Sequence, residues 1–264
     1  QHVAGIRELD EVEEDIDARN LGIVVHEVLE NLYKPWLERE VSAEQVKLLQ
    51  SLVEKELEKS LIKNKIVQES QALSGRDLVT KEVMIRLIQE VLSLDMKQAP
   101  FTVEGLERDD FDKFVNVGPY KVRISGTIDR VDDKNGTTRI TDYKTGKVEL
   151  VSRGRPAKTD EEMSEELFLD PKYKSGFQGM LYAVLMHPHI SKPLMVGVTS
   201  LRKLQQGTIW LNNGNPLPDQ SIAHYEGLLD QMVKEIFNPD VPFTQTEDVA
   251  RCGYCEFKKV CKRV

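Results

Sequence analysis

The chain has 264 residues, of which 40% are hydrophobic, so it can bury the core of one large or two modest domains. A net charge of −8 excludes a protein that holds nucleic acid by general electrostatic attraction, because phosphate contacts need clustered Lys and Arg. No run approaches the roughly 18 uninterrupted apolar residues of a membrane helix, and no secretory signal opens the chain. We therefore expect a cytoplasmic protein without a membrane partner. The acidic start without an initiator Met predicts a C-terminal fragment of a longer protein.

Helical periodicity dominates the first hundred residues. Apolar side chains recur at three- and four-residue spacing in LGIVVHEVLENLYKPW, residues 21–36, and His26 lies beside this stripe. A capping box at Ser42 begins a second helix that runs to about residue 63. A third helix is predicted from about residue 77 to residue 97, and we expect Val83, Leu87, Val91 and neighbouring side chains to be buried.

From Phe101 the hydrophobic period changes toward two. β-Branched residues gather in YKVRISGTIDRVD and TTRITDY, and Asn135-Gly136 between them is a strong hairpin signal. We predict a meander of strands to about residue 144. Residues 145–173 are charged and irregular, and we expect a long loop there that is able to fold over a site.

The remaining elements complete a mixed α/β pattern. FQGMLYAVLM predicts a helix, PLMVGVTSLRKL and GTIWL predict strands, and IAHYEGLLDQMVKEIF predicts a last helix. This order suits one mixed sheet flanked by helices. The predicted organisation is an N-terminal helical region over residues 1–100, a core over residues 101–245 and a Cys-bearing tail over residues 246–264.

The predicted hairpin places two carboxylates opposite each other. With Asn135-Gly136 as a two-residue loop, Asp129 pairs directly with Asp142, and both point to the same face. Directly paired residues have Cβ atoms about 4.5 to 5.5 Å apart, and like charges there are destabilising. A divalent cation held by both carboxylates would compensate. Lys144 shares the face of Asp142, whereas Tyr143 points the other way.

These groups suit the hydrolysis of a phosphodiester. The metal would activate water and stabilise developing charge, and Lys144 would orient the water or offset negative charge. The alternative is structural: Asp129 forms an ion pair with Arg130 or Arg139, and Asp142 and Lys144 are ordinary exposed strand residues.

Two motifs carry a resemblance to a known family. GTIDRVD at residues 126–132 and ITDYKTG at residues 140–146 together resemble the PD-(D/E)XK nuclease superfamily, in particular the RecB-like and AddB-like nuclease domains of DNA-repair helicases. The resemblance implies a restriction-endonuclease-like mixed sheet with the hairpin in its middle and helices on both sides. It also implies Mg²⁺ or Mn²⁺ held by four groups, with Lys144 beside the attacking water: His26, Asp129, Asp142 and the Tyr143 backbone carbonyl.

Three further signatures of that branch have a match in the chain. The helical Gly22-x-x-x-His26 matches a metal-ligand motif, although a lone helical histidine is more often structural. Glu107 matches an acidic catalytic residue on the preceding strand, with Glu104 as a weaker candidate. Residues implied to position the DNA strand are Gln178 and Tyr182, one turn apart, together with Arg130. The alternative for Gln178 and Tyr182 is that they are ordinary residues of a helix surface.

The three cysteines lie close together near the C-terminus. Cys252, Cys255 and Cys261 resemble part of the iron-sulfur motif of AddB-type nucleases, whose fourth cysteine lies upstream of the histidine helix. A [4Fe-4S] cluster takes four thiolates, so we expect one in the full-length protein and none intact in this chain. The alternatives are free thiols, or Zn²⁺ with His2 or His224. His187-Pro188-His189 is typical of a helix end rather than a second metal site.

The leading hypothesis is a metal-dependent deoxyribonuclease, either an exonuclease or a single-strand endonuclease. Its expected setting is a helicase-nuclease that repairs DNA double-strand breaks, with DNA and a helicase domain or subunit as partners. One alternative is a stand-alone exonuclease of the CRISPR-adaptation type. The other is a non-catalytic domain that docks a helicase or holds DNA, against which the intact Asp129, Asp142 and Lys144 argue.

Overall fold

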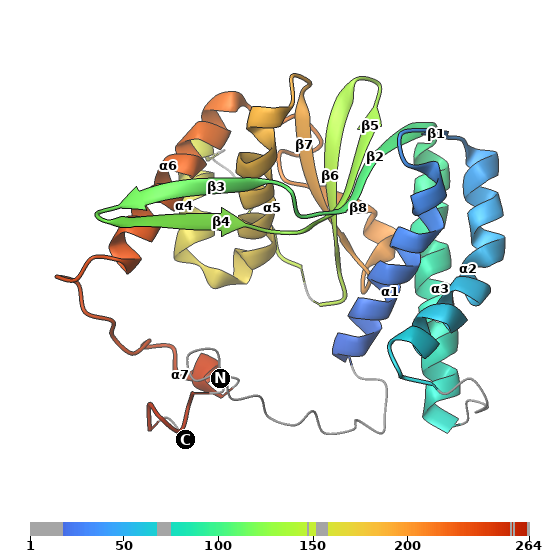
Figure 1. Cartoon of the computed structure of the whole chain (residues 1–264), viewed down its shortest axis with the longest axis horizontal. Helices are drawn as coiled ribbons and strands as arrows, with labels where there is room; N and C mark the ends of the chain where they lie inside the picture. The colour runs from blue at the N-terminus through green and yellow to red at the C-terminus, as the bar shows by residue number, and fades with distance from the viewer. Residues whose placement is uncertain are drawn as a thin grey trace.

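A mixed sheet with helices on both faces forms the body of the protein. The computed structural model describes residues 18–67, 75–146, 148–151, 158–253, 255 and 257–262. Figure 1 shows the first three helices gathered on one side of the sheet and the later helices on the other. This arrangement confirms the predicted mixed α/β, restriction-endonuclease-like class. The proposed boundaries at residues 100 and 245 stay predictions.

Six strands make up the central sheet, in the order β1-β2-β5-β6-β7-β8. The β6–β7 pair is parallel and the other pairs are antiparallel. The strands span Glu40–Val41 (β1), Phe101–Arg108 (β2), Ile128–Lys134 (β5), Thr137–Lys144 (β6), Leu194–Ser200 (β7) and Thr208–Trp210 (β8). The β5–β6 hairpin therefore lies in the middle of the sheet, as the resemblance implied.

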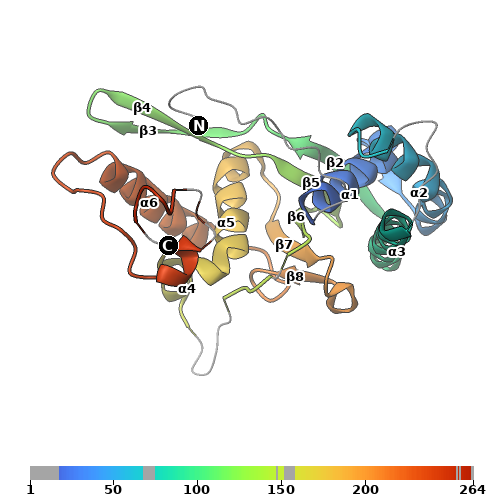
Figure 2. The same ribbon diagram turned by 90° about the horizontal axis from the view of Figure 1, so that it is seen from below.

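The predicted continuous meander is wrong at one point. Two strands, β3 (Asp112–Val117) and β4 (Tyr120–Ser125), leave the central sheet between β2 and β5 and pair only with each other among the described strands. They form a separate two-stranded ribbon that extends away from the sheet past α5 to α6, as both views show (Figures 1 and 2). β2 consequently pairs with β5 rather than with β3.

The N-terminal helices cover one face of the sheet. They are α1 (Ala18–Tyr33), α2 (Ala43–Lys63) and α3 (Gly75–Gln98). The predicted capping box at Ser42 is present, because its side chain accepts from Gln45 N–H and the Gln45 side chain accepts from Ser42 N–H. The predicted burial in α3 is confirmed at Val91 and wrong at Val83, which is 44% exposed, and the neighbouring residues Met84, Ile88 and Leu92 are buried. Apolar side chains of these helices share a core with Phe101, Val103 and Tyr143 of the sheet.

The other face is covered by α4 (Asp160–Leu169), α5 (Lys174–Met186) and α6 (Asp219–Ile236). The helix α4 falls inside the segment predicted to be an irregular loop, so that prediction is wrong over residues 160–169. Its apolar face is narrow, with only Ser164 and Leu167 buried, which explains why hydrophobic periodicity missed it. Its capping box of Thr159 and Glu162 was the available signal. Residues 152–157 of the same segment lie outside the described residues.

Short elements complete the described chain. Four 3-10 turns span Lys34–Trp36 (η1), Pro171–Tyr173 (η2), His187–His189 (η3) and Leu204–Gln206 (η4), and the last helix is α7 (Val249–Cys252). The turn η3 follows α5 directly, so His187-Pro188-His189 ends a helix as predicted. No helix in the described ranges combines the length and apolar character needed to cross a membrane.

Candidate functional site

The register of the central strands brings three carboxylates side by side. In the β5–β6 hairpin Arg130 lies opposite Thr141 and Lys134 opposite Thr137, which is the predicted register. Asn135 and Gly136 close the turn with φ of 54° and 76°, the positive values that a two-residue hairpin loop requires. One step beyond Arg130 and Thr141, the same register places Asp129 beside Asp142.

Glu107 joins this pair from the neighbouring strand. In the β2–β5 ladder, Leu106 lies opposite Arg130 and Arg108 opposite Ile128, so Glu107 and Asp129 are cross-strand neighbours. Glu104 lies at a register shift in β2, between Val103 and Gly105, and its carboxylate contacts Lys192 Nζ at 2.7 Å. The structure therefore places the stronger acidic candidate, Glu107, at the carboxylate cluster and Glu104 away from it.

The imidazole of His26 reaches the cluster from α1. Its Nδ1 lies 3.6 Å from Asp129 Oδ2 and 3.9 Å from Glu107 Oε1. Its Nε2 lies 3.0 Å from the Tyr143 carbonyl oxygen, and the Tyr143 backbone N–H donates to Asp129 Oδ2 at 2.8 Å. The backbone of Tyr143 thus touches both His26 and Asp129. These contacts bring a helix of the N-terminal layer against the end of the β5–β6 hairpin.

Three of these residues can hold a metal ion. Ligand atoms of His26, Glu107 and Asp129 all lie within 4.8 Å of one another, and no other such group occurs in the part of the chain that the structure describes. Two carboxylates and an imidazole suit Mn²⁺, and carboxylate oxygens suit Mg²⁺. Glu107 joins the implied ligands His26 and Asp129 in this group, whereas Asp142 and the Tyr143 carbonyl, which lies 3.0 Å from His26 Nε2, stay predicted ligands.

Asp142 and Lys144 form the second part of the site. Lys144 Nζ donates to Asp142 Oδ1 at 2.9 Å and lies 2.8 Å from Oδ2. Asp142 is buried, and its Oδ2 has no partner of hydrogen-bond geometry among the described atoms. Burial and the Asp129 charge raise the pKa of Asp142 to about 6, although Lys144 opposes this rise. The predicted sharing of one face by Asp142 and Lys144 agrees with this contact.

Negative charge is crowded in the cluster. Burial, followed by the Asp129 charge, raises the pKa of Glu107 to about 7. Burial also raises the pKa of Asp129, with opposition from His26 and from the Tyr143 N–H. Carboxyl groups with raised pKa values in one cleft are typical of functional sites, and a bound cation would remove the electrostatic cost.

The two α5 residues named from the sequence lie next to the carboxylates. Gln178 Nε2 donates to the Tyr182 hydroxyl at 2.6 Å. Burial, with the charges of Asp142 and Asp129, raises the pKa of Tyr182. The Tyr182 ring packs against Gly126, where an added Cβ would lie 3.0 Å from the ring. Their place beside the site fits the prediction, and their role in positioning DNA stays a prediction.

An open cleft of about 1020 Å³ runs from His26 and Lys144 toward the start of α5. Gln178 lines it, and Lys172 and Lys174 lie at its far side. Residues 147 and 152–157, which connect β6 to α4, lie outside the described residues. The cleft offers cationic groups on the side of the site that faces α5.

Arg130 occupies a different place from the one predicted. Its guanidinium is 2% exposed, donates to Asp95 at 2.7 Å and to the Tyr143 hydroxyl at 3.2 Å, and lies 3.1 Å from Asp132. It also stacks on two aromatic rings, Tyr33 and Phe101. A side chain enclosed in this way does not reach a DNA strand at the surface, so its assignment as a DNA-positioning residue is wrong.

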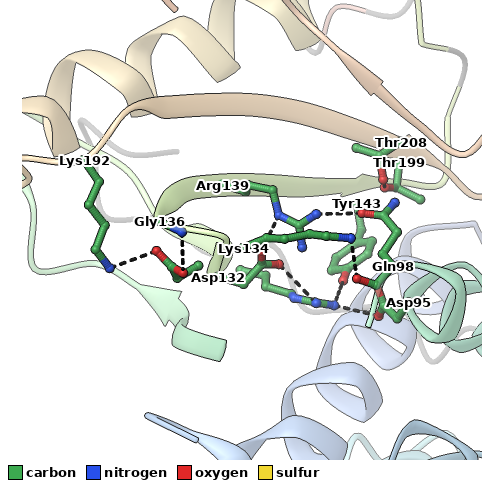
Figure 3. A network of polar contacts seen from close by, with 12 residues as sticks. Asp95, Gln98, Asp132, Lys134, Gly136, Arg139, Tyr143, Lys192, Thr199 and Thr208 are labelled. Atoms are coloured by element: carbon green, nitrogen blue, oxygen red, sulfur yellow. Dashed lines mark hydrogen bonds and ion pairs between the residues drawn. The ribbon is translucent and has the colours of Figure 1, made fainter. Parts of the chain in front are cut away.

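A buried polar network extends from Arg130 under the hairpin, on the face opposite to the carboxylates. Figure 3 shows Arg139 between Asp132 and Gln98, with Asp95 and Tyr143 close by. Arg139 donates to Asp132 at 2.5 Å and to Gln98 at 2.6 Å. Because both arginines have these partners, the structural alternative of an Asp129 pair with Arg130 or Arg139 is wrong. The contribution of α3 through Asp95 and Gln98 was missed, since no local motif marks it.

The cysteine tail shows no metal-capable group in its described residues. Cys255 is exposed, and Cys252 and Cys261 are partly buried, all as free thiols. His2 lies outside the described residues, and His224 is not grouped with the cysteines. The iron-sulfur cluster of a longer protein stays a prediction.

Comparison with known proteins identifies the family. The model of the PD-(D/E)XK nuclease superfamily matches residues 1–262. A solved structure titled "Crystal structure of SSO0001" is 14% identical over 98% of this chain and 90% of that chain, with a TM-score of 0.31. No match to this chain was found among curated proteins.

Proposed function

Because the chain belongs to the PD-(D/E)XK nuclease superfamily, we propose that it is a metal-dependent deoxyribonuclease that hydrolyses phosphodiester bonds of DNA. The observation that carries the proposal is the convergence of His26, Glu107, Asp129, Asp142 and Lys144 from one helix and three adjacent strands. Membership of this superfamily supports nuclease activity. The site geometry supports the proposed metal binding and the proposed roles of the residues.

We assign the metal to His26, Glu107 and Asp129. A Mg²⁺ or Mn²⁺ ion there would supply charge stabilisation and a more acidic bound water. The Tyr143 N–H holds Asp129 Oδ2, and the Tyr143 carbonyl fixes the His26 ring, so the ligands are oriented before the ion arrives. Asp142 Oδ2 is buried and lies 2.8 Å from Lys144 Nζ without hydrogen-bond geometry, so it can still accept from a further ligand such as a water molecule.

Lys144 is assigned to the reacting phosphate. Its ammonium is held by Asp142 and also lines the open cleft, where it can offset charge on a phosphate oxygen or orient a water molecule. Gln178 and Tyr182 are assigned to placing the strand, because Gln178 lines the same cleft and Tyr182, which holds the Gln178 amide, lies close to the carboxylates.

The biological setting is a finer proposal that rests on the motifs of the sequence. We favour the nuclease module of a helicase-nuclease that processes broken DNA in the cytoplasm, with a helicase as partner. The net charge of −8 is consistent with a strand that a partner delivers, since general attraction to DNA is not available.

The test is cleavage of end-labelled single- and double-stranded DNA with Mg²⁺, Mn²⁺ or EDTA. We expect metal-dependent cleavage of single-stranded DNA that disappears in Asp142→Ala and Lys144→Ala while circular dichroism shows a retained fold. Lys59→Ala, on the exposed face of α2, is the matched control and should cleave normally. Wild-type activity in both site variants would remove the assignment, and absence of cleavage by wild type would favour the non-catalytic alternative.

A further inference from the structure

The β3–β4 ribbon has two faces with different surroundings. Residues opposite each other in the ribbon share a face, and side chains alternate between faces along each strand. The inner face carries Lys113, Val115 and Tyr120. Val115 is buried, Lys113 contacts Glu226 and Asp230 of α6, and the Tyr120 ring lies 6.0 Å from that of Phe237. The inner face is therefore occupied by the body of the protein.

The outer face presents an aromatic ring between two cations. Phe114 is 46% exposed and lies directly opposite Arg123. Lys121 Nζ lies 4.2 Å from the centroid of the Phe114 ring. Asp112 at the root of the ribbon contacts Arg123 at 2.9 Å and is the acidic member of this face. The whole chain has a net charge of −8. The outer face, with two cations and one carboxylate beside the exposed phenyl ring, instead carries an excess of positive charge.

We propose that the outer face of the β3–β4 ribbon binds single-stranded DNA, with a base stacked on Phe114 and Lys121 and Arg123 on phosphates. The proposal rests on the nuclease function proposed above. Single-strand binding surfaces combine aromatic rings, on which bases of any sequence stack, with cations that follow the backbone. An exposed cation–π contact is a weaker interaction than base stacking. A base can therefore displace the Lys121 ammonium from the Phe114 ring, and the ammonium can then contact a phosphate.

The ribbon leads directly into the active hairpin. β4 ends at Ser125, and β5, which carries Asp129, begins at Ile128. Arg123 lies six positions before Asp129, so the cationic part of the ribbon lies at most about 20 Å from the carboxylates. A stacked strand advances about 3.4 Å per nucleotide, so about six nucleotides cover this distance. Figures 1 and 2 show the ribbon starting beside the first strands of the sheet and passing α5, the helix that carries Gln178.

Substrate length separates this surface from the catalytic site. At about 3.4 Å per nucleotide a stacked trinucleotide spans about 10 Å and a 20-nucleotide strand about 68 Å, so only the long strand covers the full distance of up to about 20 Å between the carboxylates and the ribbon. We therefore expect Phe114→Ala to weaken binding of the 20-nucleotide strand about tenfold, which corresponds to about 1.4 kcal/mol. Cleavage of the trinucleotide should be unchanged, and Phe114→Trp should restore tight binding of the long strand.

The experiment measures Kd in EDTA by fluorescence anisotropy, and kcat and KM with Mn²⁺, for both lengths. Tyr120→Ala is the matched control, because it removes an aromatic ring that is 61% exposed on the inner face of the same ribbon. It should leave the ratio of KM values for long and short strands unchanged. An equal effect of Phe114→Ala and Tyr120→Ala, or no effect of Phe114→Ala on the long strand, would overturn the proposal. Failure of the nuclease function would appear in the wild type itself, as absence of cleavage at either length.

Discussion

The ionised form of Glu107 destabilises the folded chain. Its pKa is raised to about 7 by burial first and by the Asp129 charge second. Glu107→Gln keeps the size of the side chain and removes the charge. We expect this variant to be more stable than the wild type at pH 8 in EDTA, although it loses a proposed metal ligand.

The size of the gain follows from the pKa. The rise from 4.5 to about 7 corresponds to at most about 3.4 kcal/mol, at 1.36 kcal/mol per pKa unit. The Glu107 side chain is 33% exposed, so solvent screening reduces this limit, and we expect a gain of about 1 to 2 kcal/mol. Because the folded-state pKa exceeds the unfolded value, the folded chain holds an extra proton between about pH 4.5 and 7. The free energy of unfolding of the metal-free wild type therefore falls as pH rises through this window. Glu107→Gln does not show the decrease that comes from ionisation of Glu107.

Urea unfolding of both proteins at pH 4 and pH 8, with EDTA or saturating Mn²⁺, measures these differences. In EDTA the two should be equally stable at pH 4 and differ at pH 8. With Mn²⁺ at pH 8 the order should reverse, because a ligand at 100 times its Kd adds about 2.7 kcal/mol to the protein that binds it. A Glu107→Gln variant that is less stable than wild type in EDTA at pH 8 would refute the reasoning, as would a difference that does not depend on pH.

Two further substitutions test the support of the hairpin. Tyr143→Phe removes the hydroxyl that accepts from Arg130 at 3.2 Å, and we expect a loss of about 1 to 2 kcal/mol in urea unfolding because the donor is a buried cation. Tyr143→Leu should lose more, because it also removes a buried ring, and wild-type stability of Tyr143→Phe would assign no energy to the hydrogen bond. Gly136→Ala introduces a side chain at φ of 76°, and we expect a loss of about 1 kcal/mol in the same assay with metal affinity unchanged. Unchanged stability there would contradict the observed turn.

Local signals predicted the elements on which the site is built. The register of the hairpin followed from Asn135-Gly136, because a two-residue loop leaves one pairing. The capping box at Ser42 and the apolar stripe of α1 predicted two of the three N-terminal helices. These features depend on residues within a few positions of one another, so the sequence contains the information needed to find them.

Structural features that depend on residues far apart in the chain were not predicted from the sequence. The departure of β3 and β4 from the sheet depends on α6, through Lys113 and the acidic residues more than a hundred positions away. The burial of Arg130 depends on Asp95 of α3 and on rings from two other elements. An arginine next in sequence to Asp129, a proposed metal ligand, suggests a surface role when only the strand is considered. The partners that enclose it become visible only when the helical layer is in place.

The buried network explains how a helix and a hairpin from different parts of the chain make one site. α1 carries both His26 and Tyr33, and the Tyr33 hydroxyl donates to Asp95 at 2.6 Å. Asp95 accepts from Arg130, which in turn donates to the Tyr143 hydroxyl. On the other side of the same residue, the Tyr143 backbone contacts His26 and Asp129. The position of α1 relative to β6 is thus fixed at two places, at the carboxylates and beneath the sheet. A shift of α1 would have to break both sets of contacts, so the distance between the imidazole and the carboxylates is set by the core rather than by the metal.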